Sequence, residues 1–306
     1  MNRLLSLIVF AVAASVAAGS AHAELRVFAC EPEWGSMLHE LAGDTVSVDV
    51  ATNALQDPHV VEARPSLIAK VRRADLVVCT GAELEIGWLP QLLRQAGNNK
   101  VSSGNGYFMA DSQVTLLGKP TQLDRANGDI HADGNPHIQM DPYRMLAVAK
   151  ALTARLALLD PANAATYQQR FNDFSTRWMA AIEKWEAKAA PLKGRNLVVR
   201  HDAWMYFEHW LGLNQIGTLE PKPGVPPTSS HLSDLIDLTK ASHTLAIVSA
   251  AYQDPKAANW LSGRTGVPAV TLPFTVGGDA AATDLFSLYD DSIDRLLAAL
   301  HAGAAP

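Results

Sequence analysis

Residues 161–190 read PANAATYQQRFNDFSTRWMAAIEKWEAKAA, and this stretch indicates how the rest of the chain is organised. It contains no glycine, and its only proline is its first residue, Pro161. Phe171, Phe174, Trp178 and Ile182 recur at helical spacing, with polar residues between them. A helix of about 30 residues would be about 45 Å long, more than one small lobe needs. We therefore predict a helix that connects two lobes.

Short apolar runs alternate with helical patterns on both sides of this stretch. Strands are expected at residues 25–29, 46–51, 75–79, 197–200, 244–249 and 269–274. Helices are expected at residues 34–43, 67–73, 142–159, 201–210 and 284–300. Strands that alternate with helices favour parallel βαβ units. The predicted fold class is α/β, with two lobes, each a parallel sheet flanked by helices, joined by one long backbone helix.

The first 23 residues have the pattern of a secretory signal peptide. Arg3 is followed by an uncharged apolar run over residues 4–18 and a small-x-small site at residues 21–23. The run is too short for a membrane-spanning helix, so we expect cleavage before Glu24, with a retained N-terminal anchor as the alternative. No later stretch is apolar for the ~20 residues that a bilayer requires, so the remaining chain is expected to be soluble.

The charge balance argues against two classes of function. The full chain has a net charge of −6, and because Arg3 is the only charged residue before Glu24, cleavage would change it to −7. A basic nucleic-acid-binding or membrane-surface protein does not fit this balance, and we expect no nucleic acid among the partners.

The sequence contains two cysteines, Cys30 and Cys79. Two buried thiols are the favoured interpretation, and a disulfide is the alternative.

Four polar side chains lie where the loops of an open α/β sheet bind ligands, beyond the carboxyl ends of the strands. His59 follows the second predicted strand, His137 precedes the helix at residue 142, His201 follows the strand ending at residue 200, and Asp279 follows the last strand. Three imidazoles and one carboxylate make a four-coordinate shell that suits Zn(II). The spacings of 78, 64 and 78 residues match no local metal motif, so the prediction depends on the loop placement.

Two further residues near these positions have two interpretations each. His131 lies in a polar, glycine-containing loop six residues before His137. We favour a solvated loop residue, and an auxiliary residue for metal capture is the alternative. Asp202 is either a partner that orients an imidazole or a cap at a helix start.

The chain resembles the cluster A-I solute-binding proteins of zinc and manganese ABC transporters, the ZnuA-like family. The resemblance is carried in order by DPH at 57–59, RPS at 64–66, NPH at 135–137, DP at 141–142, HDAW at 201–204 and GDA at 278–280. It implies two lobes bridged by a rigid helix with the metal between them. It also implies His59 and His137 as ligands from the first lobe, and His201 and Asp279 from the second.

Two details of the resemblance concern the metal. Manganese members generally have a carboxylate where His201 stands, and manganese prefers oxygen donors, so the third imidazole favours zinc. Many zinc members carry a long His-rich loop before the second ligand, and here the corresponding loop is short, with His131 as its histidine. Capture of zinc in two stages through such a loop is therefore not implied for this chain.

The resemblance and the site together predict a periplasmic solute-binding protein, not an enzyme. It would capture Zn(II) between its lobes and deliver it, as a monomer, to an ABC permease on the cytoplasmic membrane, with an accessory zinc chaperone as a further candidate partner. The predicted division is a signal peptide (1–23), an N-terminal metal-binding lobe (24–160), a connecting helix (161–190) and a C-terminal metal-binding lobe (191–306). The alternatives are a manganese or iron carrier of the same family, a zinc-dependent hydrolase and an adhesin on the same fold.

Overall fold

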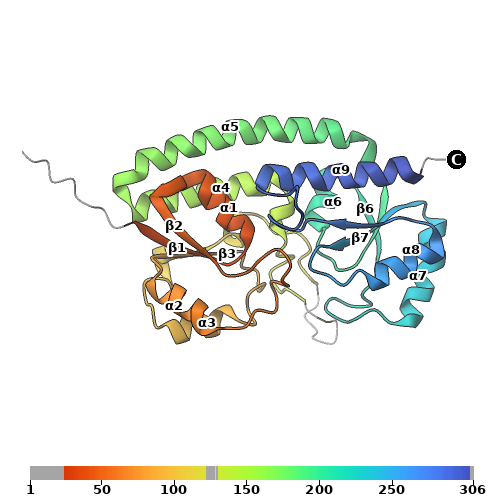
Figure 1. Ribbon diagram of the computed structural model, residues 1–306, viewed down its shortest axis with the longest axis horizontal. Helices are drawn as coiled ribbons and strands as arrows, with labels where there is room; N and C mark the ends of the chain where they lie inside the picture. The colour runs from red at the N-terminus through yellow and green to blue at the C-terminus, as the bar shows by residue number, and fades with distance from the viewer. Residues whose placement is uncertain (1–23, 122–127, 129, 304–306) are drawn as a thin grey trace, which may run out of the picture.

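The computed structural model describes residues 24–121, 128 and 130–303, so the predicted signal peptide lies outside the described residues. The described chain forms two α/β lobes that lie next to each other under one long helix (Figure 1). None of the helices in these ranges is both long enough and apolar enough to cross a membrane.

The first lobe is built on a parallel sheet with the strand order β2-β1-β3-β4. Its strands are β1 (Leu25–Ala29), β2 (Val46–Val50), β3 (Leu76–Cys79) and β4 (Tyr107–Met109). Its helices are α1 (Pro32–Ala42), α2 (Pro65–Arg73) and α3 (Leu89–Ala96). Successive β1 residues alternate between two cores: Val27 packs in the core that includes α1, and Phe28 packs with α2 and α3. Both faces of the sheet are covered, as a parallel sheet requires.

The second lobe repeats this strand order as β6-β5-β7-β8, again parallel. Its strands are β5 (Asn196–Val199), β6 (Asn214–Thr218), β7 (Thr244–Ala250) and β8 (Ala269–Leu272). Its helices are α6 (Met205–Leu211), α7 (Ser229–Ala241), α8 (Lys256–Thr265) and α9 (Leu285–Gly303). Helices α7 and α8 cover one face of the sheet, and α6 and α9 pack on the other. The predicted fold class is confirmed.

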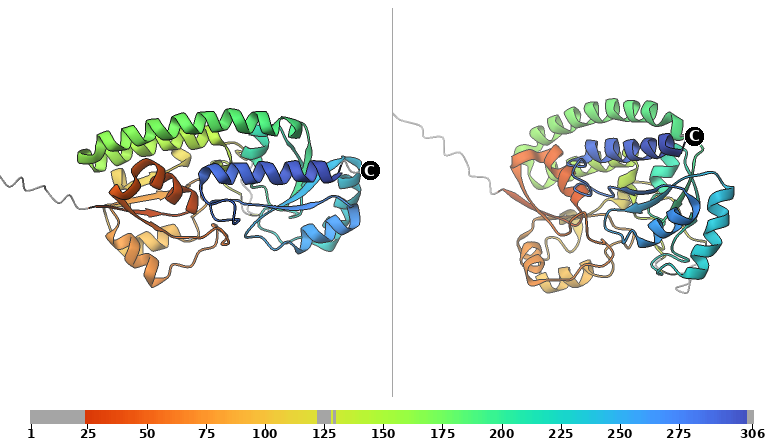
Figure 2. Two further views of the ribbon diagram at one scale, coloured as in Figure 1. Left: turned by 45° about the horizontal axis from the view of Figure 1, so that its top comes forward. Right: turned by 45° about the vertical axis from the view of Figure 1, so that its right-hand side comes forward.

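The long helix α5 (Ala164–Ala189) runs along both lobes, next to α4 (Pro142–Leu159) over the first lobe and α9 over the second (Figure 2). It begins three residues after Pro161, because a 3₁₀ turn (Pro161–Asn163) intervenes. Its buried face includes Phe174, Trp178 and Trp185, which join a core shared by both lobes. Trp178 packs edge-on against Phe286 of α9, with ring centroids 4.9 Å apart. The lobe boundaries at residues 160 and 190 stay a prediction.

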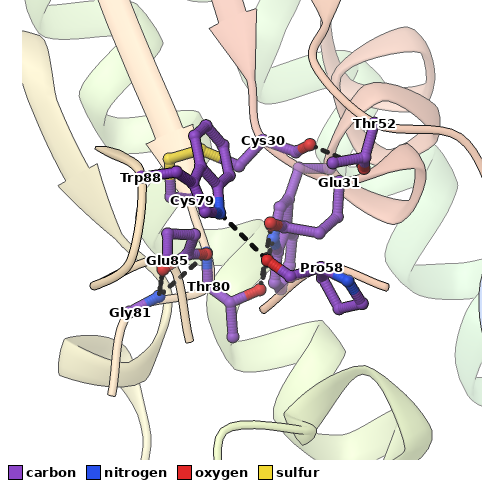
Figure 3. Close-up of a disulfide and its surroundings, with 10 residues drawn as sticks. Cys30, Glu31, Thr52, Pro58, Cys79, Thr80, Gly81, Glu85 and Trp88 are labelled. Atoms are coloured by element: carbon purple, nitrogen blue, oxygen red, sulfur yellow. Dashed lines mark hydrogen bonds between the residues drawn. A yellow bond between two sulfur atoms is a disulfide. The ribbon is translucent and has the colours of Figure 1, made fainter. Parts of the chain in front are cut away.

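Cys30 and Cys79 form a disulfide, so the favoured interpretation of two free thiols is wrong (Figure 3). Cys30 directly follows β1, and Cys79 is the last residue of β3. These strands are parallel neighbours, which brings the two Cα atoms to 4.8 Å, within the range that a disulfide spans. The bond therefore depends on the order and register of the strands, which cannot be read from the sequence.

Candidate metal centre

The structure brings three of the four predicted site residues together. His59 lies in the loop after β2, His137 directly precedes a 3₁₀ turn (Ile138–Met140), and His201 lies two residues after β5. One ring nitrogen from each lies within 4.8 Å of the others. The ring centroids are 5.5 Å apart for His59 and His137, 5.7 Å for His59 and His201, and 5.9 Å for His137 and His201.

The His59 ring is oriented by its own loop. The Oδ1 atom of Asp57 accepts a hydrogen bond from the backbone N–H of His59 at 3.0 Å and lies 2.8 Å from its Nδ1. Trp88 donates from Nε1 to the carbonyl of Pro58 at 2.9 Å, which ties the loop to the first lobe (Figure 3). Burial raises the pKa of Asp57, but the hydrogen bond and charge of His59 outweigh burial, so the pKa is lowered. With Nδ1 engaged, the buried and unpartnered Nε2 of His59 is left for a metal.

The His201 ring is oriented in the same way by a different strand. Its Nδ1 lies 2.8 Å from Oε2 of Glu220, a residue that follows β6, and this oxygen also accepts from the backbone N–H of Gly224 at 3.0 Å. Glu220 is therefore the carboxylate that orients this imidazole, and Asp202 is not. The charge of Asp202 acts on His201, but its carboxylate makes no hydrogen bond to an imidazole of the described chain, and α6 has no side-chain cap, so neither interpretation of Asp202 is supported.

His137 is the most buried of the three histidines, with 1% of its surface exposed. Both of its ring nitrogens are buried without a hydrogen-bond partner. Burial, and after it the positive charge that His59 and His201 would carry, holds the pKa of His137 well below its usual range. The backbone N–H of His137 donates to Oδ1 of Asn135 at 3.0 Å. A neutral imidazole with unpartnered nitrogens offers a lone pair to a metal at neutral pH.

Asp279, the fourth predicted ligand, is not brought to the imidazoles. Its Oδ2 lies 2.7 Å from Arg295 of α9, and its Oδ1 accepts from the backbone N–H of Ala281 at 3.0 Å. Among the residues that the structure describes, no carboxylate joins the three imidazoles within 4.8 Å. After β8 it is Phe274 that reaches the site, with its ring edge-on to His137 at 5.1 Å. The glycines before Asp279 therefore lead into a turn and not to the cluster.

His131 lies beside the cluster, so the favoured interpretation of a solvated residue is wrong. Its ring centroid is 5.4 Å from that of His59, and its Nε2 is buried without a partner. Burial, followed by the charge of His59, lowers the pKa of His131 to about 4. A cavity of about 270 Å³ opens on His131, His137 and His201, and its other lining residues are Gly118, Pro120, Ile130, Asn135, Asp202, Met205 and Pro223. A hydrated metal ion therefore has room to reach the imidazoles.

The chain matches a family model described as ZnuA, zinc-uptake complex component A, periplasmic, over residues 27–299. It is 25% identical over 285 residues to the high-affinity zinc uptake system protein ZnuA of Paracoccus denitrificans, covering 82% of this chain and 84% of that protein. It is 24% identical over 232 residues to the zinc-binding lipoprotein AdcA of Streptococcus pneumoniae, covering 74% of this chain and 45% of AdcA. The chain thus spans less than half the length of AdcA.

Solved structures are similar over nearly the whole chain. A crystal structure of ZnuA superposes with a TM-score of 0.73 at 23% identity, covering 89% of this chain and 98% of the other. At that identity the likeness shows the fold. Other relatives are named for manganese or iron transport, so the names of the relatives do not agree on one metal.

Proposed function

The chain belongs to the ZnuA family, and from this premise we propose that it captures Zn(II) between its lobes in the periplasm and hands it to an ABC importer. The family is one of solute-binding transport proteins. Delivery to a permease, help from an accessory zinc chaperone, a monomeric state and the lack of enzymatic activity are parts of the same proposal.

One observation carries the proposal: His59, His137 and His201 offer three nitrogens to one point, from loops of both lobes. Asp57 and Glu220 each engage the Nδ1 atom of an imidazole. Such carboxylate–imidazole pairs orient histidine ligands and raise their basicity. His59 and His137 belong to the first lobe and His201 to the second, so a metal bound by all three would lie between the lobes.

The donor set favours zinc over the manganese or iron alternative. Zn(II) is borderline-soft and is commonly bound by imidazole, whereas Mn(II) prefers oxygen ligands. The three-histidine cluster in the described chain contains no carboxylate. Manganese would therefore meet only nitrogen donors from the protein and would bind more weakly than zinc.

The geometry gives less support to a zinc hydrolase. Such an enzyme needs a general base near the metal in addition to an open coordination position. Within the described chain, the carboxylates that hydrogen-bond to these imidazoles are Asp57 and Glu220. A carboxylate that orients a ligand in this way is not free to take a proton from water.

The test is metal analysis of protein purified from the periplasm, followed by competition between Zn(II) and Mn(II). We expect one tightly bound zinc per chain that a large excess of manganese does not displace. His59→Ala should lower the zinc affinity about tenfold or more, and His39→Ala, at an exposed position of α1, should leave it unchanged. Protein that binds no zinc, or a His59→Ala variant that binds as tightly as the parent, would refute the proposal.

A further inference from the structure

A fourth imidazole lies close enough to join the cluster. The His131 ring centroid is 5.4 Å from that of His59 and 6.4 Å from that of His137. Imidazoles bound to one zinc through bonds of about 2.0–2.1 Å have ring centroids roughly 5 Å apart. The His131 nitrogens lie outside the 4.8 Å group of the other three. A loop movement of about 1 Å would therefore bring His131 to the metal.

The ring of His131 has a nitrogen that is available to a metal. The backbone of Ala82 lies beside this ring. The Nε2 atom of His131 is buried and has no hydrogen-bond partner. His59 shares this feature, because its Nε2 is also buried without a partner. An unpartnered buried nitrogen costs free energy, and a bound cation would remove that cost.

The turn that carries Ala82 has an unusual backbone. Gly81, Ala82 and Glu83 have consecutive φ angles of 83°, 49° and 64°. Two successive non-glycine residues with positive φ are uncommon, and such strain persists only where the surroundings impose it. The same turn reaches the neighbouring backbone of the loop, because Oε2 of Glu83 accepts from the N–H of Ala132 at 2.7 Å.

The surroundings that impose this turn belong to the end of β3. Glu85 accepts from the backbone N–H groups of Thr80 and Gly81, and Asp111 accepts from that of Ala82 at 2.6 Å. The disulfide of Cys79 lies directly before this segment (Figure 3). The position of His131 thus depends on a network fixed in the first lobe.

The other side of the loop approaches the second lobe. A Cβ atom added at Gly128 would lie 2.2 Å from the carbonyl oxygen of Pro223, so the backbone approaches too closely for any other residue. The segment that carries His131 therefore touches elements of both lobes.

We propose that His131 is the fourth zinc ligand, so that the metal is held by four imidazoles. This inference rests on the proposed function and deepens it, because it assigns the coordination position that Asp279 does not fill. A shell of four nitrogen donors contains no protein oxygen, which is the ligand atom that manganese prefers. His131 would therefore contribute to selectivity for zinc together with His201.

The test compares the full chain with His131→Ala, His131→Asn, His59→Ala and the exposed control His39→Ala. Zinc affinity is measured by competition with a chromogenic chelator, and X-ray absorption at the zinc edge counts the bound imidazoles. We expect four imidazoles in the parent, and three with an added oxygen donor in both His131 variants. Their zinc affinity should fall about tenfold or more, and His39→Ala should match the parent.

The outcomes separate this inference from the proposed function. If both His131 variants keep the affinity and the absorption spectrum of the parent, the inference is overturned while zinc capture stands. Unchanged affinity with slower zinc uptake would also overturn it, in favour of a role in capture. If the parent binds no zinc, or His59→Ala binds as the parent does, both proposals fail. Thermal melts of the metal-free variants show whether each of them is folded.

Discussion

Glu220 accepts a hydrogen bond from Nδ1 of His201 at 2.8 Å, and the two residues stand two positions beyond the ends of the neighbouring strands β6 and β5. The parallel pairing continues past both strands, since the N–H of Glu220 donates to the carbonyl of Arg200 at 3.2 Å. The orientation of a proposed ligand thus depends on strand pairing within the second lobe. The corresponding pair in the first lobe, Asp57 and His59, lies within one loop.

Removing the Glu220 carboxylate should weaken zinc binding without removing a ligand. Glu220→Ala frees the His201 ring and lowers its basicity, so we expect a loss of affinity of roughly 10–100-fold, and a smaller loss for Glu220→Gln, which keeps an acceptor oxygen. The measurement is a chelator competition titration. Asp237→Asn is the control, because Asp237 lies at an exposed position of α7. Equal losses for the Glu220 and Asp237 variants would contradict this assignment.

Asp279 should matter to the turn before α9 and not to the metal. Its ion pair with Arg295 and its hydrogen bond to the N–H of Ala281 are both partly exposed. We expect Asp279→Ala to keep the zinc affinity of the parent and to lower Tm slightly, and Arg295→Gln to do the same. Parallel zinc titrations and thermal melts check this. A large loss of zinc affinity in Asp279→Ala alone would restore Asp279 as a ligand.

Stability should fall as pH rises because of a buried carboxyl in α6. Burial, and after it the charge of Asp202, raises the pKa of Glu208 from 4.5 to about 8. At a pH between 4.5 and 8, the Glu208 carboxyl loses its proton in the unfolded chain and keeps it in the folded chain. The free energy of unfolding therefore decreases as pH rises, by roughly 2–4 kcal/mol between pH 5 and 8. The side chain of the Glu208→Gln variant does not titrate, so its free energy of unfolding should not decrease in this way. The stability of the variant relative to the parent should therefore increase as pH rises.

Thermal melts of the parent and Glu208→Gln at pH 5 and 8.5 measure this difference. The control is Glu183→Gln, on the exposed side of α5, whose Tm difference from the parent should be the same at both pH values. A Tm difference for Glu208→Gln that does not grow with pH would show that the carboxyl is ionised in the folded protein.

Loss of the disulfide should destabilise the first lobe. The bond joins residues that are 49 positions apart. In the chain-entropy model, a disulfide that closes a loop of this length stabilises the folded protein by about 4 kcal/mol. The double variant Cys30→Ala, Cys79→Ala should therefore melt roughly 10 °C below the parent. Reductant should lower the Tm of the parent and leave that of the variant unchanged. Equal Tm values for the parent and the variant would mean that the bond contributes no stability.

The main elements and most of the histidine cluster follow from local patterns in the sequence. The apolar periodicity of α5 is local information, and so are the runs of β1, β3, β5 and β7. Because ligands bind beyond the carboxyl ends of parallel strands, the residue order places the loops of His59 and His201 at the binding edges of their two sheets. The short strands β4 and β6 and the helices α3, α7 and α8 are not predicted, since their apolar patterns are brief or mixed.

Which residues meet depends on the packing of the chain in three dimensions. Strand order and register join Cys30 to Cys79 and place Glu220 beside His201, although 49 and 19 positions separate the partners along the chain. The turn after β8 sends Phe274 toward His137 and Asp279 toward Arg295. A loop held by the side chain of Glu83 brings His131 next to His59. Each of these contacts depends on the direction of side chains in space, and residue spacing carries no information about that direction.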